Sequence, residues 1–361
     1  MDASQYGQTP RSRYAGLTYR ELHHALGPAV QAELTALLDG LGPDAPGVRL
    51  AAAALLRART FGHPLETLPL LVHGVETGDP EPAVPLAAVH LLWWTSACHF
   101  DDLADAGAAP TGTAPGREAG APGPEAALLA AVLCGTVLPL RILQSSPLDP
   151  AVREALSAEL VRGAVSGAEG QLADLHPDPA GAERGTVLAT YRGKSGGPFG
   201  MITAMAARLA GADAPRTALW REFGEVFGLL WQLFNDQQDL LTGRNEDLAN
   251  GTVTYLLAGA LEDAATPVRQ RLLTLAAAAR TPALATPAAV RAACAARAEL
   301  AAHLQHAAVL DRFHADLRAL RAHADRVLTR LGGDEDHLPA LRALTALASA
   351  PLLRPATVPA A

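Results

Sequence analysis

The sequence contains little that would indicate a secreted, disulfide-bonded protein. Its 361 residues include three cysteines, Cys98, Cys134 and Cys294, which are far apart and form no CxxC pair. An odd number of scattered cysteines is typical of a reduced protein rather than a disulfide framework. The polar residues 1–13 lack the apolar stretch of a signal peptide. We therefore expect a cytoplasmic location.

Excess positive charge and long apolar runs are also lacking. The chain has 29 Lys and Arg against 37 Asp and Glu, which gives a net charge of −8. It shows no basic stripe with interleaved aromatics, so we do not expect a nucleic-acid partner. The most apolar runs, 84–100 and 126–140, are shorter than the about 20 residues of a membrane-spanning helix. Stable membrane insertion is therefore not expected.

Aromatic residues make up only 4% of the chain, and no segment shows the alternation of a half-buried strand. Hydrophobic residues make up 49%, mostly Ala and Leu, and recur at spacings of three and four. This pattern predicts a single all-α domain of about ten helices over residues 16–350. The Gly- and Pro-rich segment 107–124 is predicted to be a flexible loop. Residues 1–15 and 351–361 are predicted to be disordered.

Two acidic motifs, about 130 residues apart, each follow an apolar, helix-like run. They are Asp101-Asp102-x-x-Asp105 and Asn235-Asp236-x-x-Asp239. The first and last members of each motif are four residues apart and share one helix face. Carboxylates at the edge of an apolar core require a neutralising cation, and oxygen ligands suit Mg²⁺, which takes further ligands from phosphate. The pair predicts a magnesium–diphosphate site, although one DDxxD alone is common on solvated helices.

Further motifs, in matching order and spacing, resemble the trans-polyprenyl diphosphate synthase family within the class I isoprenoid synthases. Besides the acidic motifs, they are Gly193-Lys194-Ser195-Gly196, with Ser in place of Thr, Gly228-x-x-Trp231-Gln232, and Asp247-Leu248-x-x-Gly251-x-x-Thr254. The resemblance covers roughly residues 40–270. It implies a single isoprenoid-synthase-type helical bundle around a central active-site cavity, and a homodimer.

The resemblance also implies the cofactor, the substrate and the roles of individual residues. It implies three Mg²⁺ ions bound with the diphosphate of an allylic prenyl substrate, where they stabilise the leaving group. Lys194 and Gln232 would hold the diphosphate. The implied metal-binding residues are Asp101, Asp102, Asp105, Asn235, Asp236 and Asp239. The implied catalytic residues are four of these six, namely Asp101, Asp105, Asn235 and Asp239.

The chain departs from the family where elongating synthases bind isopentenyl diphosphate. The basic Gly-Lys-Arg-x-Arg motif is here Gly47-Val48-Arg49-Leu50-Ala51, which keeps only Arg49 as a candidate substrate contact. Arg117 is the only basic residue in the segment 107–124, and Thr252 replaces a downstream Lys that in the family contacts the allylic diphosphate. A diphosphate requires cations or oriented donors, so these losses argue against ordinary elongation. Asp102 also loses its expected Arg partner, which leaves its role open.

Asn235 also argues against elongation and favours cyclisation, because class I terpene cyclases use Asn, Ser/Thr and Glu at four-residue intervals for their second metal site. Gly243 cannot serve as the third ligand, which leaves Glu246 or Asp247 as substitutes. The alternative is a simple Asp-to-Asn change in a working synthase.

In this family the residues before the first acidic motif form the pocket wall. Counting back from Asp101 gives Ala97, which is small, and then Trp94 and Trp93, either of which could form the floor. Eight residues of helix span roughly 12 Å, which suggests a C15 or C20 substrate. Aromatic faces also stabilise carbocations, although core packing is the alternative for each candidate. The candidates are Trp93, Trp94, Phe100, Trp231 and Phe234.

These observations favour a terpene synthase that converts a linear C15 or C20 diphosphate to a hydrocarbon or alcohol and diphosphate. The alternative is a trans-prenyltransferase that elongates with isopentenyl diphosphate or alkylates an uncharged acceptor. A third hypothesis is a non-catalytic partner subunit of a true synthase. The retained metal-binding positions argue against this last hypothesis.

Overall fold

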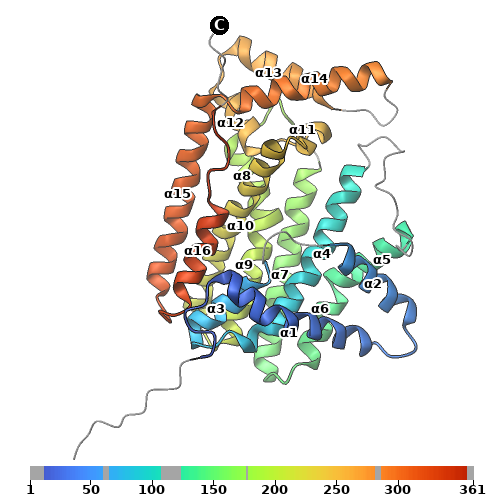
Figure 1. Ribbon diagram of the computed structural model, residues 1–361, viewed down its shortest axis with the longest axis vertical. Helices are drawn as coiled ribbons and strands as arrows, with labels where there is room; N and C mark the ends of the chain where they lie inside the picture. Colours follow the sequence, from blue (N-terminus) through green and yellow to red (C-terminus); the bar gives the residue numbers. More distant parts are fainter. Residues whose placement is uncertain (1–11, 60–64, 107–122, 176–177, 281–285, 356–361) are drawn as a thin grey trace, which may run out of the picture.

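The computed structural model describes residues 12–59, 65–106, 123–175, 178–280 and 286–355 (Figure 1). Of these residues 80% are helical and none lies in a strand, which confirms the predicted all-α class. The described helices are α1 (Tyr19–Asp39), α2 (Pro46–Ala58), α3 (Thr67–Thr77), α4 (Val84–Ala106), α5 (Pro124–Gly135), α6 (Val137–Ser145), α7 (Pro150–Asp174), α8 (Arg184–Tyr191), α9 (Gly197–Leu209), α10 (Ala214–Thr242), α11 (Glu246–Asn250), α12 (Tyr255–Asp263), α13 (Thr266–Ala279), α14 (Pro287–Leu304), α15 (Ala307–Leu331) and α16 (Leu338–Ala348).

The described part of the chain holds sixteen α-helices, more than the ten or so expected. Apolar runs that look continuous in the sequence are interrupted, as at Thr136 between α5 and α6. Residues 107–122 of the predicted flexible loop lie outside the described residues.

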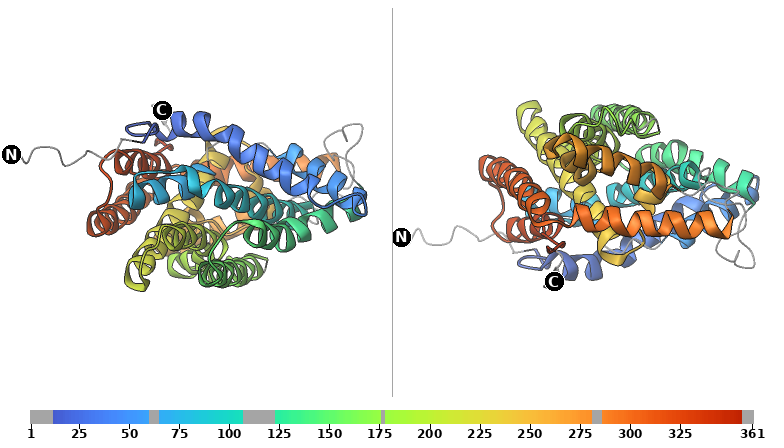
Figure 2. Two further views of the ribbon diagram at one scale, coloured as in Figure 1. Left: turned by 90° about the horizontal axis from the view of Figure 1, so that it is seen from below. Right: turned by 90° about the horizontal axis from the view of Figure 1, so that it is seen from above.

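The long helices α4, α7, α10 and α15 run along the bundle, α1 lies across one end, and α13 and α14 lie across the other (Figures 1 and 2). Helix α9 packs against both α7 and α10. All residues from Pro198 to Ala207 are buried. A helix that is apolar on every side belongs inside a bundle, so α9 forms the centre of the core.

A π-helical turn, Arg192–Gly196, joins α8 to α9 and lies between two glycines. A Cβ atom at Gly170 of α7 would lie 2.0 Å from the backbone nitrogen of Lys194. One at Gly228 of α10 would lie 2.6 Å from the carbonyl oxygen of Ser195. Only glycine permits this approach, which holds the turn against the C-terminal halves of α7 and α10.

The described residues include short parts of both chain ends that are predicted to be disordered. Tyr14 is buried, although residues 1–15 are predicted to be disordered. At the other end, the side-chain amide of Gln237 in α10 donates to the Ala350 carbonyl at 3.2 Å and accepts from the Leu352 backbone nitrogen at 2.8 Å. Leu353 is buried. A buried side chain in each segment, together with the Gln237 contacts at the C-terminal end, anchors the segments to the bundle, a tertiary effect that their polar or Pro-rich composition does not reveal. Residues 1–11 and 356–361 lie outside the described part.

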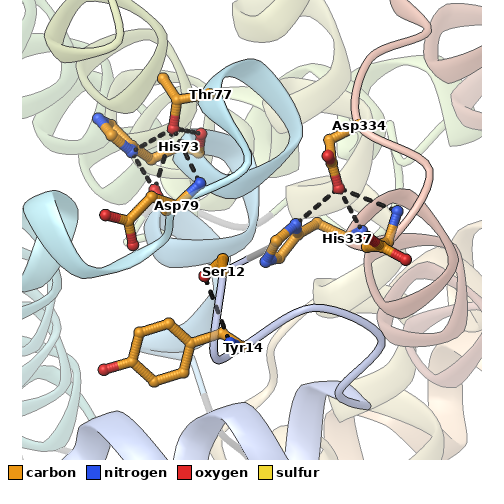
Figure 3. Close-up of polar contacts among 8 residues, drawn as sticks. Ser12, Tyr14, His73, Thr77, Asp79, Asp334 and His337 are labelled. Atoms are coloured by element: carbon orange, nitrogen blue, oxygen red, sulfur yellow. Dashed lines mark hydrogen bonds and ion pairs between the residues drawn. The ribbon is translucent and has the colours of Figure 1, made fainter. Parts of the chain in front are cut away.

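The segment between α15 and α16 is fastened to α3 by a histidine. The Nδ1 atom of His337 lies 2.8 Å from the carboxylate of Asp334 (Figure 3). The imidazole ring packs so closely on Gly74 that a Cβ atom there would lie 2.8 Å from it. The nearby Asp336 carbonyl accepts from the Gly16 backbone nitrogen at 3.3 Å. The last helices and the N-terminal segment are thereby linked at one end of the bundle.

Within the described residues no single helix is long and apolar enough to cross a membrane. The bent pair α5 and α6, with a 40° break between them, passes such a test only when taken together. All three cysteines are free thiols.

Candidate active site

Helices α4, α7 and α10 end on the same side of the bundle, below α11 (Figure 1). Asp101, near the end of α4, is half-buried. Its Oδ1 atom accepts hydrogen bonds from Lys194 Nζ at 2.8 Å and from Gln171 Nε2 at 3.1 Å. The first acidic motif is thus joined to α7 and to the π-helical turn. The side chain of Asp105, also predicted to bind metal, lies outside the described residues.

Asp102 points away from this contact and is exposed. It forms an ion pair with Arg59, which immediately follows α2. The expectation that Asp102 has no arginine partner is therefore wrong. This arginine lies at the end of α2. The family resemblance placed the partner instead in the segment that follows the first acidic motif.

Lys194 is the only lysine in the chain. Its ammonium group lies between two carboxylates, because Nζ also donates to Asp174 Oδ2 at 2.7 Å. Burial acts to lower the pKa of Lys194, but the charges of Asp101 and Asp174 outweigh it and raise the pKa above its ordinary value. The side chain therefore stays protonated at the point where α4, α7 and the π-helical turn meet.

The second acidic motif is tied to the same turn by a chain of hydrogen bonds. Ser195 Oγ donates to Gln232 Oε1 at 2.8 Å, and Gln232 Nε2 donates to Asp236 Oδ1 at 3.2 Å. The Tyr191 hydroxyl donates to the other oxygen of Asp236 at 2.6 Å. Burial raises the pKa of Asp236 to about 7, although both hydrogen bonds act to lower it. Asp236 is thus a buried carboxylate with no cation in direct contact among the described residues.

The structure separates the other members of the second motif. Asn235 is exposed, whereas Asp239 is buried and accepts from the backbone nitrogens of Glu246 at 3.0 Å and Asp247 at 3.3 Å. This contact holds the start of α11 over the site. Burial, followed by the charges of Asp236 and Asp239, raises the pKa of Asp247 well above its ordinary value. Of the two candidate third ligands, Asp247 faces the carboxylates while Glu246 is exposed.

The donor chemistry of this region fits a hard divalent cation. Asp236 is buried and Asp247 is half-buried; burial raises both pKa values, and the charge of Asp236 raises that of Asp247 further, so the two carboxylates lie close together. Carboxylate oxygens are the ligands that Mg²⁺ prefers. In this conformation no three suitable side chains among the described residues converge on one point, so the ligand set would assemble with the substrate phosphates.

An aromatic cluster lies one to two turns below the acidic ends of α4 and α10. We define it as Trp93, Trp94, Phe199, Phe227, Trp231 and Phe234. Phe199 of α9 is central, with its ring centroid 5.2 Å from that of Trp94 and 6.3 Å from that of Trp231. Trp231 stacks on both Phe227 and Phe234. The structure therefore brings together the tryptophans predicted from both motifs and adds Phe199 between them.

The remaining predicted wall residues lie at the rim. Ala97 is half-buried, and Phe100 is 38% exposed and contacts His99 rather than the aromatic cluster. Arg49, the candidate contact for a second diphosphate, is exposed on α2 and lies 3.8 Å from Asp39. Its location gives no indication of a diphosphate site.

The orientation of Trp94 is fixed by a buried histidine. Trp94 Nε1 donates to His90 Nε2 at 2.7 Å, and His90 Nδ1 lies 3.2 Å from the Leu65 carbonyl, to which it donates. Burial lowers the pKa of His90 to about 3, so the ring is neutral. A neutral ring can accept from Trp94, which a protonated one could not.

Four residues that the motifs did not reveal help to build this region: Gln171, Asp174, Tyr191 and Phe199. Two of them lie on α7, where the only sequence signal is the spacing Gly163, Gly167 and Gly170; Gly163 makes room for Met201, Gly167 for Trp93, and Gly170 for the π-helical turn. Small residues at spacings of four and three indicate a close helix contact, but they do not reveal which segment makes it.

The family profile described as polyprenyl synthetase matches residues 124–293. The chain carries a polyprenyl synthetase domain. The family predicted from the motifs is thereby confirmed, and the matched segment includes Lys194 and the second acidic motif. No functionally curated protein matches the sequence at a significant level.

Solved structures with the same fold extend the likeness to the whole polyprenyl synthetase chain. Polyprenyl synthetase from Streptomyces coelicolor A3(2) is 18% identical, with a TM-score of 0.74 over 91% of this chain and 98% of that one. Geranylgeranyl pyrophosphate synthetase from Pyrococcus horikoshii Ot3 is 18% identical, with a TM-score of 0.72 over 92% and 98%. Geranylgeranyl pyrophosphate synthase from Corynebacterium glutamicum, complexed with isoprenyl diphosphate and magnesium, is 19% identical, with a TM-score of 0.69 over 89% and 97%. These similarities confirm the isoprenoid-synthase-type helical bundle.

Proposed function

We propose that this polyprenyl synthetase relative is a Mg²⁺-dependent prenyltransferase that ionises an allylic diphosphate and transfers its prenyl group. The observation that carries the proposal is the position of Lys194, whose ammonium group bridges Asp101 and Asp174. A protonated donor with a carboxylate on each side can hold a diphosphate together with divalent cations. The names of the similar structures, two geranylgeranyl pyrophosphate synthases and a polyprenyl synthetase, support transfer as the reaction.

Asp101 and Asp236 are the best placed of the described carboxylates to hold Mg²⁺, with Asp247 in reach of the second. Bound there, the cation would supply stabilisation of the negative charge on the departing diphosphate. Lys194 and Gln232 would orient the diphosphate oxygens. The aromatic cluster would exclude water from the allylic cation, and its position below Asp101 supports a C15 or C20 chain.

Cyclisation without a second substrate is the other candidate, and it is the one that the sequence favoured. Val48 and Ala51 stand where elongating synthases hold isopentenyl diphosphate with basic residues, and Thr252 replaces a Lys that contacts the allylic diphosphate. The π faces gathered around Phe199 could stabilise the carbocations of a cyclase. A prenyltransferase with a non-phosphorylated acceptor accounts equally for the missing basic residues and agrees better with the family.

The test is an incubation with Mg²⁺ and geranyl, farnesyl or geranylgeranyl diphosphate, alone, with isopentenyl diphosphate, or with a non-phosphorylated acceptor. We expect release of inorganic diphosphate and a prenylated product. Asp101→Asn and Asp236→Asn should each lower the rate at least about 100-fold, because metal and leaving-group contacts supply several kcal/mol. Asp311→Asn, an exposed change on α15, is the matched control. A volatile hydrocarbon from the allylic diphosphate alone would establish the cyclase instead, and near-normal rates in either site variant would refute the metal assignment.

A homodimer is also part of the proposal, and an exposed apolar stripe on α7 supports it. Val161, Val165, Leu172 and Leu175 are 58%, 65%, 57% and 46% exposed. Their spacing places them on one helix face, and contiguous apolar surface of this kind marks interaction sites. Sedimentation of the wild type and of Val165→Glu tests the assignment, since a charge on this stripe should shift the mass towards the monomer.

A further inference from the structure

A groove of about 270 Å³ opens beside the candidate active site, between the end of α7, helix α8 and the segment before α12. Val187 and Val253 form buried apolar walls, and the hydroxyls of Thr186 and Thr190 lie along α8. Asp174 and Asp178 supply the acidic side. The mixture of apolar walls and a few polar groups is typical of a site for a small molecule.

The groove shares its residues and its helices with the active site. Asp174 lines it and also accepts from Lys194 at 2.7 Å. Thr190 is followed directly by Tyr191, which donates to Asp236. Val253 follows the segment that begins with Asp247. A molecule in the groove would therefore lie next to the carboxylates that surround the proposed diphosphate site.

The charge of the groove determines which molecule it can take. None of the described residues that line it is cationic, and two are carboxylates. Asp178 is exposed and accepts a hydrogen bond from the backbone nitrogen of Ala180 at 3.0 Å. Lys194 is already paired with Asp101 and Asp174 and does not line the groove, so a second diphosphate would place further negative charge beside Asp174 and Asp178 without a cation of its own, which is unfavourable. An ammonium group would be attracted to the same position.

We propose that this groove binds the acceptor of the prenyl group, and that the acceptor is a small aromatic amine without phosphate. The inference rests on the proposed function and adds the location and chemical class of the second substrate. The ammonium group is held at the acidic side, so its nitrogen has no free electron pair and the aromatic ring must be the nucleophile. The allylic C–O bond breaks with its electron pair leaving on diphosphate, a ring carbon forms the new C–C bond, and the proton lost from that carbon passes to the released diphosphate.

The experiment measures binding by calorimetry, independently of turnover, with tryptamine as the aromatic amine, indole as its uncharged counterpart and isopentenyl diphosphate as the anionic acceptor. We expect tryptamine to bind at least about tenfold more tightly than indole, and isopentenyl diphosphate not to displace it. Thr190→Trp, which fills the groove, should weaken tryptamine binding at least about tenfold. Asp178→Asn, at an exposed position that does not affect packing, should weaken it about threefold and leave indole binding unchanged.

Ala189→Trp, an exposed neighbour on α8 outside the groove, is the matched control and should bind tryptamine as the wild type does. Equal affinity for indole and tryptamine, displacement by isopentenyl diphosphate, or unchanged binding in both groove variants would overturn the proposal. The two proposals fail separately. Diphosphate release without tryptamine binding refutes the groove assignment, whereas tryptamine binding without release of diphosphate from any allylic substrate refutes the proposed function.

Discussion

Replacing Lys194 by Ala tests whether this single ammonium group holds the acidic region together. The change leaves Asp174, whose side chain is only 16% exposed, without its cation. Removing one partner of a buried pair costs about 3–5 kcal/mol. Asp101 is 41% exposed and adds less than about 1 kcal/mol after screening by solvent. Because Lys194 is itself 18% exposed, we expect the low end, a loss of about 3 kcal/mol in the free energy of unfolding.

Urea unfolding followed by circular dichroism measures this loss. Asp174→Asn added to Lys194→Ala should recover at least about half of it, because the second change removes the uncompensated charge. Arg318→Ala, which removes an exposed cation from α15, should stay within about 0.5 kcal/mol of the wild type. The reasoning is refuted if Lys194→Ala is as stable as this control, or if Asp174→Asn gives no recovery.

Two further predictions concern the core around the site. The free energy of unfolding should fall by about 2 kcal/mol between pH 7 and pH 5 on account of His90, because its pKa of about 3 in the folded chain lies below the unfolded value and only the unfolded chain gains a proton in this range. Urea unfolding at both pH values should show that His90→Gln loses this part of the pH dependence and that His24→Gln keeps it. An unchanged pH dependence in both variants would contradict the prediction. Gly170→Ala should lower the free energy of unfolding by about 3 kcal/mol, because the added Cβ would lie 2.0 Å from the Lys194 backbone. Gly185→Ala, whose Cβ would have no atom within 4 Å, should be nearly neutral by the same measurement. Equal stability of the two variants would argue against the close contact.

The sequence predicted the helical class and the family because both depend on local patterns. Apolar spacing of three and four can be recognised from residues that are close in the sequence, and so can the motif that contains Lys194. The arrangement around the motif depends on contacts between distant segments. Asp174 is one of several acidic residues on α7, and only the position of the π-helical turn makes it the partner of Lys194.

The second motif shows the same limit. Helical spacing predicted that Asn235 and Asp239 act together, but the start of α11 folds over Asp239 and leaves Asn235 exposed. Asp236, between them in the chain, makes the contacts with Tyr191 and Gln232 instead. Periodicity places a residue on a helix face, yet the neighbouring helices decide which face is interior.

The single lysine has a practical consequence for chemical labelling. The chain offers amine-reactive reagents one side-chain amine, at the centre of the candidate active site. Its raised pKa keeps it protonated and therefore slow to acylate, while cations that neutralise Asp101 and Asp174 would release the free amine more readily. The rate of acylation at this one position is thus a site-specific reporter of ion occupancy, readable by mass spectrometry without knowledge of the substrate.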